Sequence, residues 1–331
     1  MADEQPLLYL NADAVRRALP MSAAIEAMRT AFTELAAGGA KVPERIHLDV
    51  EQNSGVALFM PAHSPACQKL AVKVVTLFEG NADRGLERIQ GQVVLLDDQT
   101  GQTLAILDGK ALTAIRTGAV SGLATDLLAR RDAKTVAIFG AGVQARTQLE
   151  AICAVRDITA AKVYSQSANS AQRFAEQMAK ALGIRVVAAT SSADALAGAD
   201  IVCTATTSSS PVFNDADLPK TVHINAVGSY QPQVREIAEA TVVRSRIVVD
   251  QIKAALAEAG ELIQPIESGA LQRGAVNTEL GQLLISPELS RSNQSNITLF
   301  KSVGLAIQDV HAAAEAARIA TEQSIGQRLC R

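Results

Sequence analysis

A glycine-rich pattern in the middle of the chain has the residue types and the spacing that bind a pyrophosphate. Gly140, Gly142 and Ala145 directly follow the apolar run 136–139, and a helical pattern begins at about residue 143. In a strand–turn–helix unit, the first glycine allows a tight turn, the second admits a phosphate, and the small third residue lets helix and strand pack closely. The free N–H groups at the helix start attract the anion. The pattern predicts a dinucleotide-binding site; a glycine turn without a ligand is the alternative.

The residues after the next apolar run indicate which dinucleotide is bound. That run ends at Ser165, Gln166 and Ser167, where an NAD-selective site usually carries an acid for the ribose 2′-hydroxyl. None of the three is acidic, so a 2′-phosphate is tolerated. We therefore expect NADP or NAD, with NADP(H) slightly favoured, since Ser and Gln side chains also hydrogen-bond a free ribose.

Three cations lie in apolar surroundings in the first part of the chain. Lys73 lies between Val72 and Val74, where a lysine is costly unless it is paired or functional. Arg45 and Arg116 are also embedded in apolar segments, and an arginine can hold a carboxylate through two hydrogen bonds. The three residues predict a site for a small carboxylate. The alternatives are an edge-strand lysine that reaches solvent and arginines in ordinary salt bridges.

Metal and hydrolase chemistry lack their sequence patterns. The four histidines show no HxH or HExxH spacing, so we predict no metal site. No GxSxG turn is present, which argues against a serine hydrolase. The chemistry that remains is that of a dinucleotide and a small anion.

Composition limits the partners. The net charge of −3 gives no basic surface for nucleic acid or an anionic membrane, and an aromatic content of 3% is too low for base-stacking platforms. No apolar run approaches the about 18 residues that suggest a membrane span, and the N-terminus is acidic where a signal peptide is basic. Four irregularly spaced cysteines favour free thiols. We expect a cytoplasmic protein with no nucleic-acid or membrane partner.

The elements that must position these residues change character along the chain. Residues 12–37 have a helical pattern that Pro20 interrupts. Short apolar runs separated by turn residues then predict a largely antiparallel sheet, with strands at 44–50, 55–62, 69–78, 91–97 and 102–108.

The remainder of the chain has the pattern of an α/β domain. Residues 110–130 and 298–320 read as helices. Between them, apolar runs alternate with helical segments, which predicts parallel strands at 136–139, 162–165, 186–189, 201–206, 222–227 and 247–250. The fold class is therefore α/β, with a Rossmann-type doubly wound parallel sheet after a strand-rich first half.

Six segments of the chain together resemble a known protein family. The chain resembles the ornithine cyclodeaminase/mu-crystallin family in six segments that occur in the family's order: MPAH (60–63), AVKVVTLFEGN (71–81), LDGKALTAIRTGAVSGLAT (107–125), FGAGVQAR (139–146), INAVGSYQP (224–232) and LFKSVGLAIQD (299–309). The resemblance implies NAD(P)-dependent chemistry on amino or imino acids and a homodimer. It also implies a substrate-binding and dimerisation domain split between 1–120 and 305–331, with a Rossmann domain over 121–304.

The resemblance also implies roles for individual residues. It places Arg45, Lys73 and Arg116 around the substrate carboxylate. We add Val303 to the substrate-binding residues and take Lys73 and Tyr230 as the catalytic candidates, because Lys73 can hold a proton and Tyr230 can donate or orient one through water. The resemblance places Val143, Gln144, Ser165, Thr206, Val227 and Ser302 along the cofactor. With the residues of the glycine turn and of the next strand end, the predicted cofactor set also includes Arg116, Thr117, Gly140, Gly142, Gln166 and Ser167.

Two positions depart from the cyclodeaminase members of the family. Leu58 stands where they carry Glu, and Tyr230 follows a turn after which they carry Asp. Cyclodeamination needs a carboxylate to hold and deprotonate the terminal amine, whereas an imine reductase needs an anchored carboxylate and a protonated imine nitrogen. The leading hypothesis is a ketimine reductase that forms L-proline or L-pipecolate. The alternatives are an ornithine cyclodeaminase, then an alanine-dehydrogenase-type enzyme, then a non-catalytic binding protein.

Overall fold

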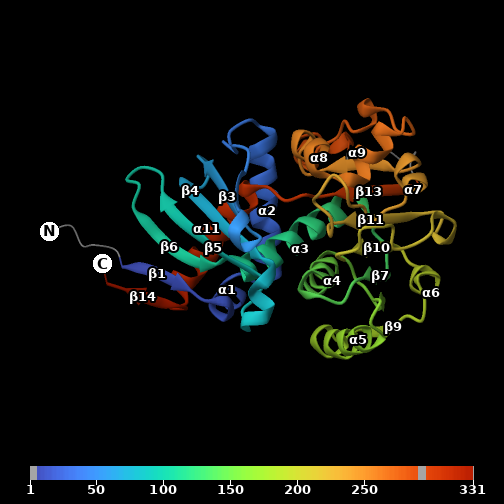
Figure 1. Ribbon diagram of the computed structural model, residues 1–331, viewed down its shortest axis with the longest axis horizontal. Coiled ribbons are helices and arrows are strands. Elements are labelled where there is room, and N and C mark those ends of the chain that lie inside the picture. The colour runs from blue at the N-terminus through green and yellow to red at the C-terminus, as the bar shows by residue number, and fades with distance from the viewer. Residues whose placement is uncertain (1–5, 290–295, 331) are drawn as a thin grey trace. The chain divides into compact units, whose positions relative to one another are not determined.

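The computed structural model of the chain describes residues 6–289 and 296–330. They form two compact units. One unit comprises the chain up to Arg116 and again from Leu305, and the other comprises Thr117–Gly304. Each unit has a sheet of its own, and the helix α3 (Gly109–Leu128) carries the chain from the first unit into the second (Figure 1). None of the helices in the described ranges is long and apolar enough to cross a membrane.

The first unit contains a mixed sheet covered by helices. The described strands follow the order β14-β1-β6-β5-β4-β3-β2, and every neighbouring pair is antiparallel except β1 and β6. Its strands are β1 (Leu7–Leu10), β2 (Ile46–Val50), β3 (Gly55–Ser64), β4 (Lys69–Phe78), β5 (Ile89–Asp97), β6 (Thr103–Asp108) and β14 (Gln327–Leu329). Its helices are α1 (Ala12–Ala18), α2 (Met21–Ala36) and α11 (Ala306–Glu322). The five antiparallel strands predicted from sequence are β2–β6, whereas the edge strand β14 and its neighbour β1 were not predicted.

Side-chain alternation gives this sheet one buried face. In the strand register Met60 lies opposite Lys73, Lys73 opposite Val93, and Val93 opposite Leu107, so these four side chains share a face. All four are buried, and α11 packs against β3, β4 and β5 on this side. Lys73 therefore points into the core of the unit, because its position in the strand has the inward parity.

The second unit is a doubly wound parallel sheet, as the sequence predicted. The described strands follow the order β12-β13-β11-β10-β7-β8-β9, and all neighbouring pairs are parallel. Its strands are β7 (Thr135–Phe139), β8 (Ala160–Tyr164), β9 (Arg185–Ala188), β10 (Ile201–Thr204), β11 (Val222–Ala226), β12 (Arg246–Val249) and β13 (Ile297–Lys301). Its helices after α3 are α4 (Val143–Val155), α5 (Ala168–Leu182), α6 (Ser192–Leu196), α7 (Glu239–Val243), α8 (Ile252–Glu258), α9 (Gly260–Glu267) and α10 (Leu280–Ile285).

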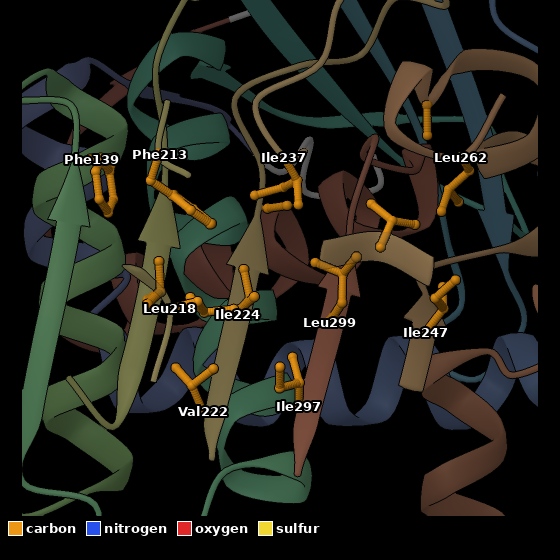
Figure 2. Packing of buried hydrophobic residues seen from close by; sticks show 14 of the residues in the cluster. Phe139, Phe213, Leu218, Val222, Ile224, Ile237, Ile247, Leu262, Ile297 and Leu299 are labelled. Carbon is orange, nitrogen blue, oxygen red and sulfur yellow. The ribbon is translucent and has the colours of Figure 1, made fainter. Parts of the chain in front are cut away.

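Two hydrophobic clusters fill the two faces of this parallel sheet. Alternate residues of one strand enter different clusters: Val136 and Ile138 pack with α4 and α5, whereas Ala137 and Phe139 pack with the segments that contain α6–α9. Figure 2 shows the second cluster, where Phe139 and Ile224 from neighbouring regions of the sheet join residues of the covering segments. Because both faces are covered, the strands are mostly apolar, and the buried polar residues within β11, His223 and Asn225, hydrogen-bond to Thr298 and Thr125.

One sequence prediction is wrong in this unit. Residues 298–320 were expected to form a single helix, but Ile297–Lys301 is strand β13 and the helix α11 begins at Ala306. All five residues of β13 are buried between β11 and β12. A short strand covered on both faces has no alternation, so its apolar run reads like the start of a helix. Gly304, with a φ of +81°, separates the two elements.

Candidate active site

A buried ion cluster in the first unit contains two of the three predicted cations. Lys73 on β4 and Arg116 on α3 both contact Asp309 on α11. The Lys73 Nζ lies 2.8 Å from Asp309 Oδ2, and the Arg116 Nε donates to Asp309 Oδ1 at 3.0 Å. Arg116 also donates from Nη1 to the Gln308 side-chain oxygen at 2.6 Å. The three charged side chains are at most 6% exposed, so the cluster is shielded from bulk water.

The electrostatics of this cluster leave positive charge in excess. Burial lowers the pKa of Lys73 to about 8; the charge of Asp309 opposes this, and the charges of Arg116 and Arg45 reinforce it. Burial raises the pKa of the Asp309 carboxyl, but Lys73 and Arg116 outweigh it and hold that pKa below its usual value. Arg45, directly before β2, is therefore close enough to act on Lys73. Two cations, Lys73 and Arg116, face the single carboxylate of Asp309, and this imbalance suits an anionic ligand.

Asp309 and Gln308 were missed in the sequence. Asp309 lies 193 positions after Arg116, inside a segment that reads as an ordinary helix. A single acid in a helix is normally a solvated residue. The signal that was present is the predicted set of buried cations, which requires a partner but does not locate it.

The glycine turn of the second unit is built as the sequence predicted it. Gly140, which follows β7, has a φ of +103°, and a Cβ there would lie 2.5 Å from the Ala205 carbonyl oxygen. Gly142 is the N-cap residue of α4, makes no side-chain cap, and has open space where a Cβ would stand. No acidic residue occupies the first turn of α4. The turn thus exposes helix N–H groups to a phosphate.

A second observation in this turn fits a bound dinucleotide. Among the described residues, the buried Gln144 Oε1 has no hydrogen-bond partner, which leaves an acceptor for a ligand at the start of α4. Val143 beside it is 50% exposed, an unusual position for a valine that no ligand covers. Thr117, another predicted cofactor residue, accepts from the Gln148 side chain at 3.2 Å through its carbonyl oxygen. The residues present therefore fit the predicted cofactor.

The end of β8 has the residues that were expected at the ribose. Ser165, Gln166 and Ser167 connect β8 to α5, and the Ser167 hydroxyl oxygen caps α5 by accepting from the Ser170 N–H at 3.3 Å. No acid lies in the first turn of α5. This edge of the site carries no negative charge that would repel a 2′-phosphate.

The other predicted cofactor residues lie at the ends of three neighbouring strands. Thr206 lies two residues after β10, Val227 follows β11, and Ser302 follows β13. Val303, predicted to bind the substrate, comes directly after Ser302 and belongs to the second unit. Two buried carboxylates that the sequence did not reveal, Asp250 and Glu236, accept hydrogen bonds from residues at these strand ends. Asp250 Oδ2 accepts from the Ser302 hydroxyl at 2.9 Å and from the Val303 N–H at 2.8 Å.

A signal for one of these carboxylates was available. Asp250 is the last residue of the predicted strand 247–250, and polar residues at strand ends mark the ligand-binding edge of a parallel sheet. Glu236, the other carboxylate, lies in a polar stretch between elements and gave no such signal.

Comparison with known proteins places the chain in a family. The model of the ornithine cyclodeaminase/mu-crystallin family matches residues 7–322. The chain belongs to this family. It is 38% identical over 324 residues to a Δ1-pyrroline-2-carboxylate reductase of Bacillus thuringiensis subsp. konkukian, covering 98% of this chain and 99% of the relative.

Solved structures resemble the chain over nearly its full length. The Thermococcus litoralis Δ1-pyrroline-2-carboxylate reductase in complex with NADH and L-proline is 40% identical, with a TM-score of 0.92 and coverage of 98% of this chain and 100% of that one. An archaeal alanine dehydrogenase dimer with bound NAD is 30% identical, with a TM-score of 0.90 and coverage of 98% and 99%. The similarity extends over both units, so it includes the cation cluster of the first unit and the glycine turn of the second.

The two departures from the cyclodeaminase members differ in their surroundings. Leu58 lies two residues before Met60 on β3, so it shares the sheet face of Lys73, and it is 8% exposed. An apolar side chain therefore stands on this face where those family members carry an acid. Tyr230 belongs to the other unit, in the segment after β11, and is 42% exposed.

Proposed function

We propose that this protein is an NAD(P)H-dependent ketimine reductase that converts a small cyclic imino acid, Δ1-pyrroline-2-carboxylate or Δ1-piperideine-2-carboxylate, into L-proline or L-pipecolate. One observation carries the proposal. The buried cluster of Lys73, Arg116 and Asp309 has excess positive charge, in a chain that aligns over nearly its full length with Δ1-pyrroline-2-carboxylate reductases.

The cluster is suited to bind the substrate carboxylate. Arg116 uses Nε and Nη1 for Asp309 and Gln308, which fixes the plane of the guanidinium. No side chain or backbone group in the described part of the chain accepts from its Nη2, which can therefore donate to a ligand. Lys73 and Arg116 together carry two positive charges against the one carboxylate of Asp309. A substrate carboxylate supplies the missing negative charge, and a neutral analogue does not.

The reaction adds a hydride to the imine carbon and leaves a proton on the imine nitrogen. NAD(P)H, when bound, would supply this hydride. Lys73, with a pKa of about 8, holds a proton at Nζ at neutral pH yet can release it, so it can keep the imine nitrogen protonated. Asp309 fixes the Lys73 ammonium at 2.8 Å. Tyr230 is the second residue proposed to donate or orient a proton, through water.

Leu58 favours reduction over cyclodeamination. Cyclodeamination of ornithine needs a carboxylate beside the terminal amine. The buried Leu58 on the sheet face of Lys73 supplies none. A reductase uses the same bound carboxylate and hydride but no terminal amine, so the loss of the acid leaves its chemistry intact.

The test is NAD(P)H oxidation followed by absorbance, with Δ1-pyrroline-2-carboxylate and Δ1-piperideine-2-carboxylate as substrates and chiral analysis of the products. We expect turnover of at least one imine and formation of the L-amino acid. Pyruvate with ammonia and L-ornithine are tested in parallel. Turnover of ornithine, or of pyruvate alone, would replace the proposal with cyclodeaminase or alanine dehydrogenase activity, and cofactor binding without turnover would indicate a binding protein.

For the cofactor we propose both NADH and NADPH, with NADPH slightly preferred. Related structures contain NADH or NAD. The support for NADPH is local: Ser165, Gln166 and Ser167 and the first turn of α5 carry no acid.

We also propose a homodimer formed through the exposed face of the first sheet. Ile46 and Leu48 on β2 are 59% and 55% exposed, and their register partners Phe59 and Ala57 lie on the same face, opposite the face that α11 covers. An apolar sheet face of this kind is covered by a partner in stable proteins. A second copy is the expected partner, because the archaeal alanine dehydrogenase is a dimer.

We propose a cytoplasmic location. The four cysteines are free thiols, and that of Cys203 is buried. Free thiols are typical of reducing compartments.

A further inference from the structure

The carboxylate of Glu236 is buried at the carboxyl edge of the parallel sheet. Glu236 lies between β11 and α7, is 0% exposed, and is followed by Ile237, which packs into the hydrophobic cluster of Figure 2. Its Oε1 accepts from the Thr206 N–H and the Thr206 hydroxyl, both at 2.7 Å. Its Oε2 accepts from the Thr204 hydroxyl at 2.9 Å and the Gly228 N–H at 2.8 Å. Each oxygen therefore accepts one backbone N–H and one hydroxyl.

These four donors come from the ends of two neighbouring strands. Thr204 is the last residue of β10, Thr206 follows it, and Gly228 lies two residues beyond β11. The order of the strands reverses between β7 and β10, the place where parallel sheets of this kind bind their ligands. Glu236 thus joins the two strand ends next to the predicted cofactor site.

The segment that Glu236 binds also packs against the glycine turn. The Ala205 N–H donates to the Phe139 carbonyl oxygen at 2.9 Å, and the Ala205 carbonyl lies where a Cβ of Gly140 would stand. The segment that Glu236 holds through Thr206 is therefore the segment against which the phosphate-binding turn packs. A shift of Thr206 moves one wall of that turn.

Gly228 shows that the position of the carboxylate is specific. A Cβ on Gly228 would lie 2.5 Å from the Glu236 carboxyl carbon and from each of its oxygens. Only glycine leaves room for the carboxylate at this distance from the backbone. The glycine and the acid form a matched pair.

A second carboxylate holds Glu236 itself. Glu261 Oε1 accepts from the Glu236 backbone N–H at 3.0 Å, and Glu261 Oε2 pairs with the Lys301 Nζ at 3.1 Å. Lys301 ends β13, directly before Ser302, and donates to the Ser229 carbonyl at 2.6 Å. The network thereby extends from β10 to β13, across the strand ends that carry the predicted cofactor residues.

We propose that Glu236 is a positioning residue for the cofactor, which sets the ends of β10 and β11 and the wall of the glycine turn in the geometry that binds NAD(P)H. The inference rests on the proposed use of NAD(P)H. It assigns Glu236 no contact with the cofactor and no part in proton transfer. Its role is to join two loops through four hydrogen bonds that a neutral amide cannot reproduce, because an amide places an N–H against a donor.

The test compares Glu236→Gln with Glu34→Gln, a matched control. Glu34 is another buried carboxylate; it accepts from the Ser64 hydroxyl at 2.5 Å and from the Ala66 N–H at 2.9 Å, and it lies 2.9 Å from His311 Nε2. It belongs to the first unit, whereas the glycine turn belongs to the second. The dissociation constant of NADH is measured by calorimetric titration, and thermal unfolding is followed by circular dichroism. We expect both variants to unfold at lower temperature. Only Glu236→Gln should weaken NADH binding, by about ten-fold or more.

A milder variant tests the same contact in case Glu236→Gln does not fold. Thr204→Val removes the hydroxyl donor and preserves the shape of a side chain that is 0% exposed. We expect NADH binding to weaken by about three-fold, and the imino-acid KM to change less than the cofactor KM. Unchanged NADH affinity in Thr204→Val and in folded Glu236→Gln overturns the inference, as does an equal loss in Glu34→Gln. A wild-type protein that binds neither NADH nor NADPH overturns the proposed function and this inference with it.

Discussion

Replacement of Asp309 by asparagine tests whether this carboxylate sets the protonation of Lys73. In the wild-type protein the pKa of Lys73 is about 8, a balance of burial, which lowers it, and the nearby Asp309, which raises it. A lysine required in its protonated form is fully active below its pKa and inactive above it. The wild-type kcat/KM for imine reduction should therefore fall with rising pH around pH 8.

The magnitude follows from the separation of the charges. At the 2.8 Å between Lys73 Nζ and Asp309 Oδ2, two unit charges attract by about 6 kcal/mol at an effective dielectric constant of about 20. Water and rearrangement absorb part of this in the variant, so we set the threshold at about one pH unit, or about 1.4 kcal/mol. Asp309→Asn should move the descending limb to lower pH by at least that amount. Leaving Lys73 and Arg116 without their carboxylate should also cost about 3–5 kcal/mol of stability.

The assay is kcat/KM for Δ1-pyrroline-2-carboxylate from about pH 6 to pH 10 at constant ionic strength, for the wild type, Asp309→Asn and the control Glu34→Gln. The imine substrate also titrates, but in the same way in all three assays. A difference between the descending limbs of the pH profiles therefore comes from a group of the enzyme. Glu34→Gln removes a buried carboxylate without touching Lys73 and should keep the wild-type limb. A limb of Asp309→Asn that coincides with the wild type would show that Lys73 is not the titrating group or that Asp309 does not control it.

Four further outcomes are expected. Lys73→Met should lower imine reduction by about 10³-fold or more while the Kd of NADH stays within about two-fold, and equal loss of both would indicate a structural role. Arg116→Lys should raise the imino-acid KM by about ten-fold, more than it raises the Kd of NADH, because the planar guanidinium that holds the carboxylate is lost; an unchanged KM contradicts carboxylate binding by Arg116. kcat/KM for NADPH should modestly exceed that for NADH, and a large preference for NADH refutes the interpretation of Ser165–Ser167. Leu48→Asp should convert a dimer into monomers in light scattering after gel filtration, and a persistent dimer places the interface elsewhere.

The parts of the fold that the sequence predicted are those with local patterns. The strand–turn–helix around Gly140 and the antiparallel strands β2–β6 carry glycine spacing, alternation and turn residues within a few positions of each other. β13 has no such pattern, because all five of its residues are buried between two strands distant in sequence. Its strand state is a consequence of the sheet that surrounds it, which a local pattern does not contain.

The same distinction applies to the site. Lys73 was recognisable because a lysine within an apolar strand is costly, and the structure shows how that cost is met, through Asp309 at 2.8 Å. Asp309 itself looked ordinary, since an acid in a helix needs no explanation until the helix is known to be buried. Glu236 was hidden for the same reason, in a polar connecting segment. The sequence thus reveals anomalous cations more readily than the carboxylates that compensate them.

Asp309 and Glu236, the carboxylates that the sequence did not reveal, have different roles in these proposals, and the difference can be measured. Asp309 neutralises Lys73 and Arg116, so its charge is what matters, and its amide should move a pH profile. Glu236 accepts hydrogen bonds from Thr206 and Gly228 among others, so its acceptor geometry is what matters, and its amide should change cofactor affinity. Measured on both variants, the pH limb should shift only in Asp309→Asn and the Kd of NADH only in Glu236→Gln. If both variants moved both quantities, general loosening of the fold would explain the data and the separate roles would be wrong.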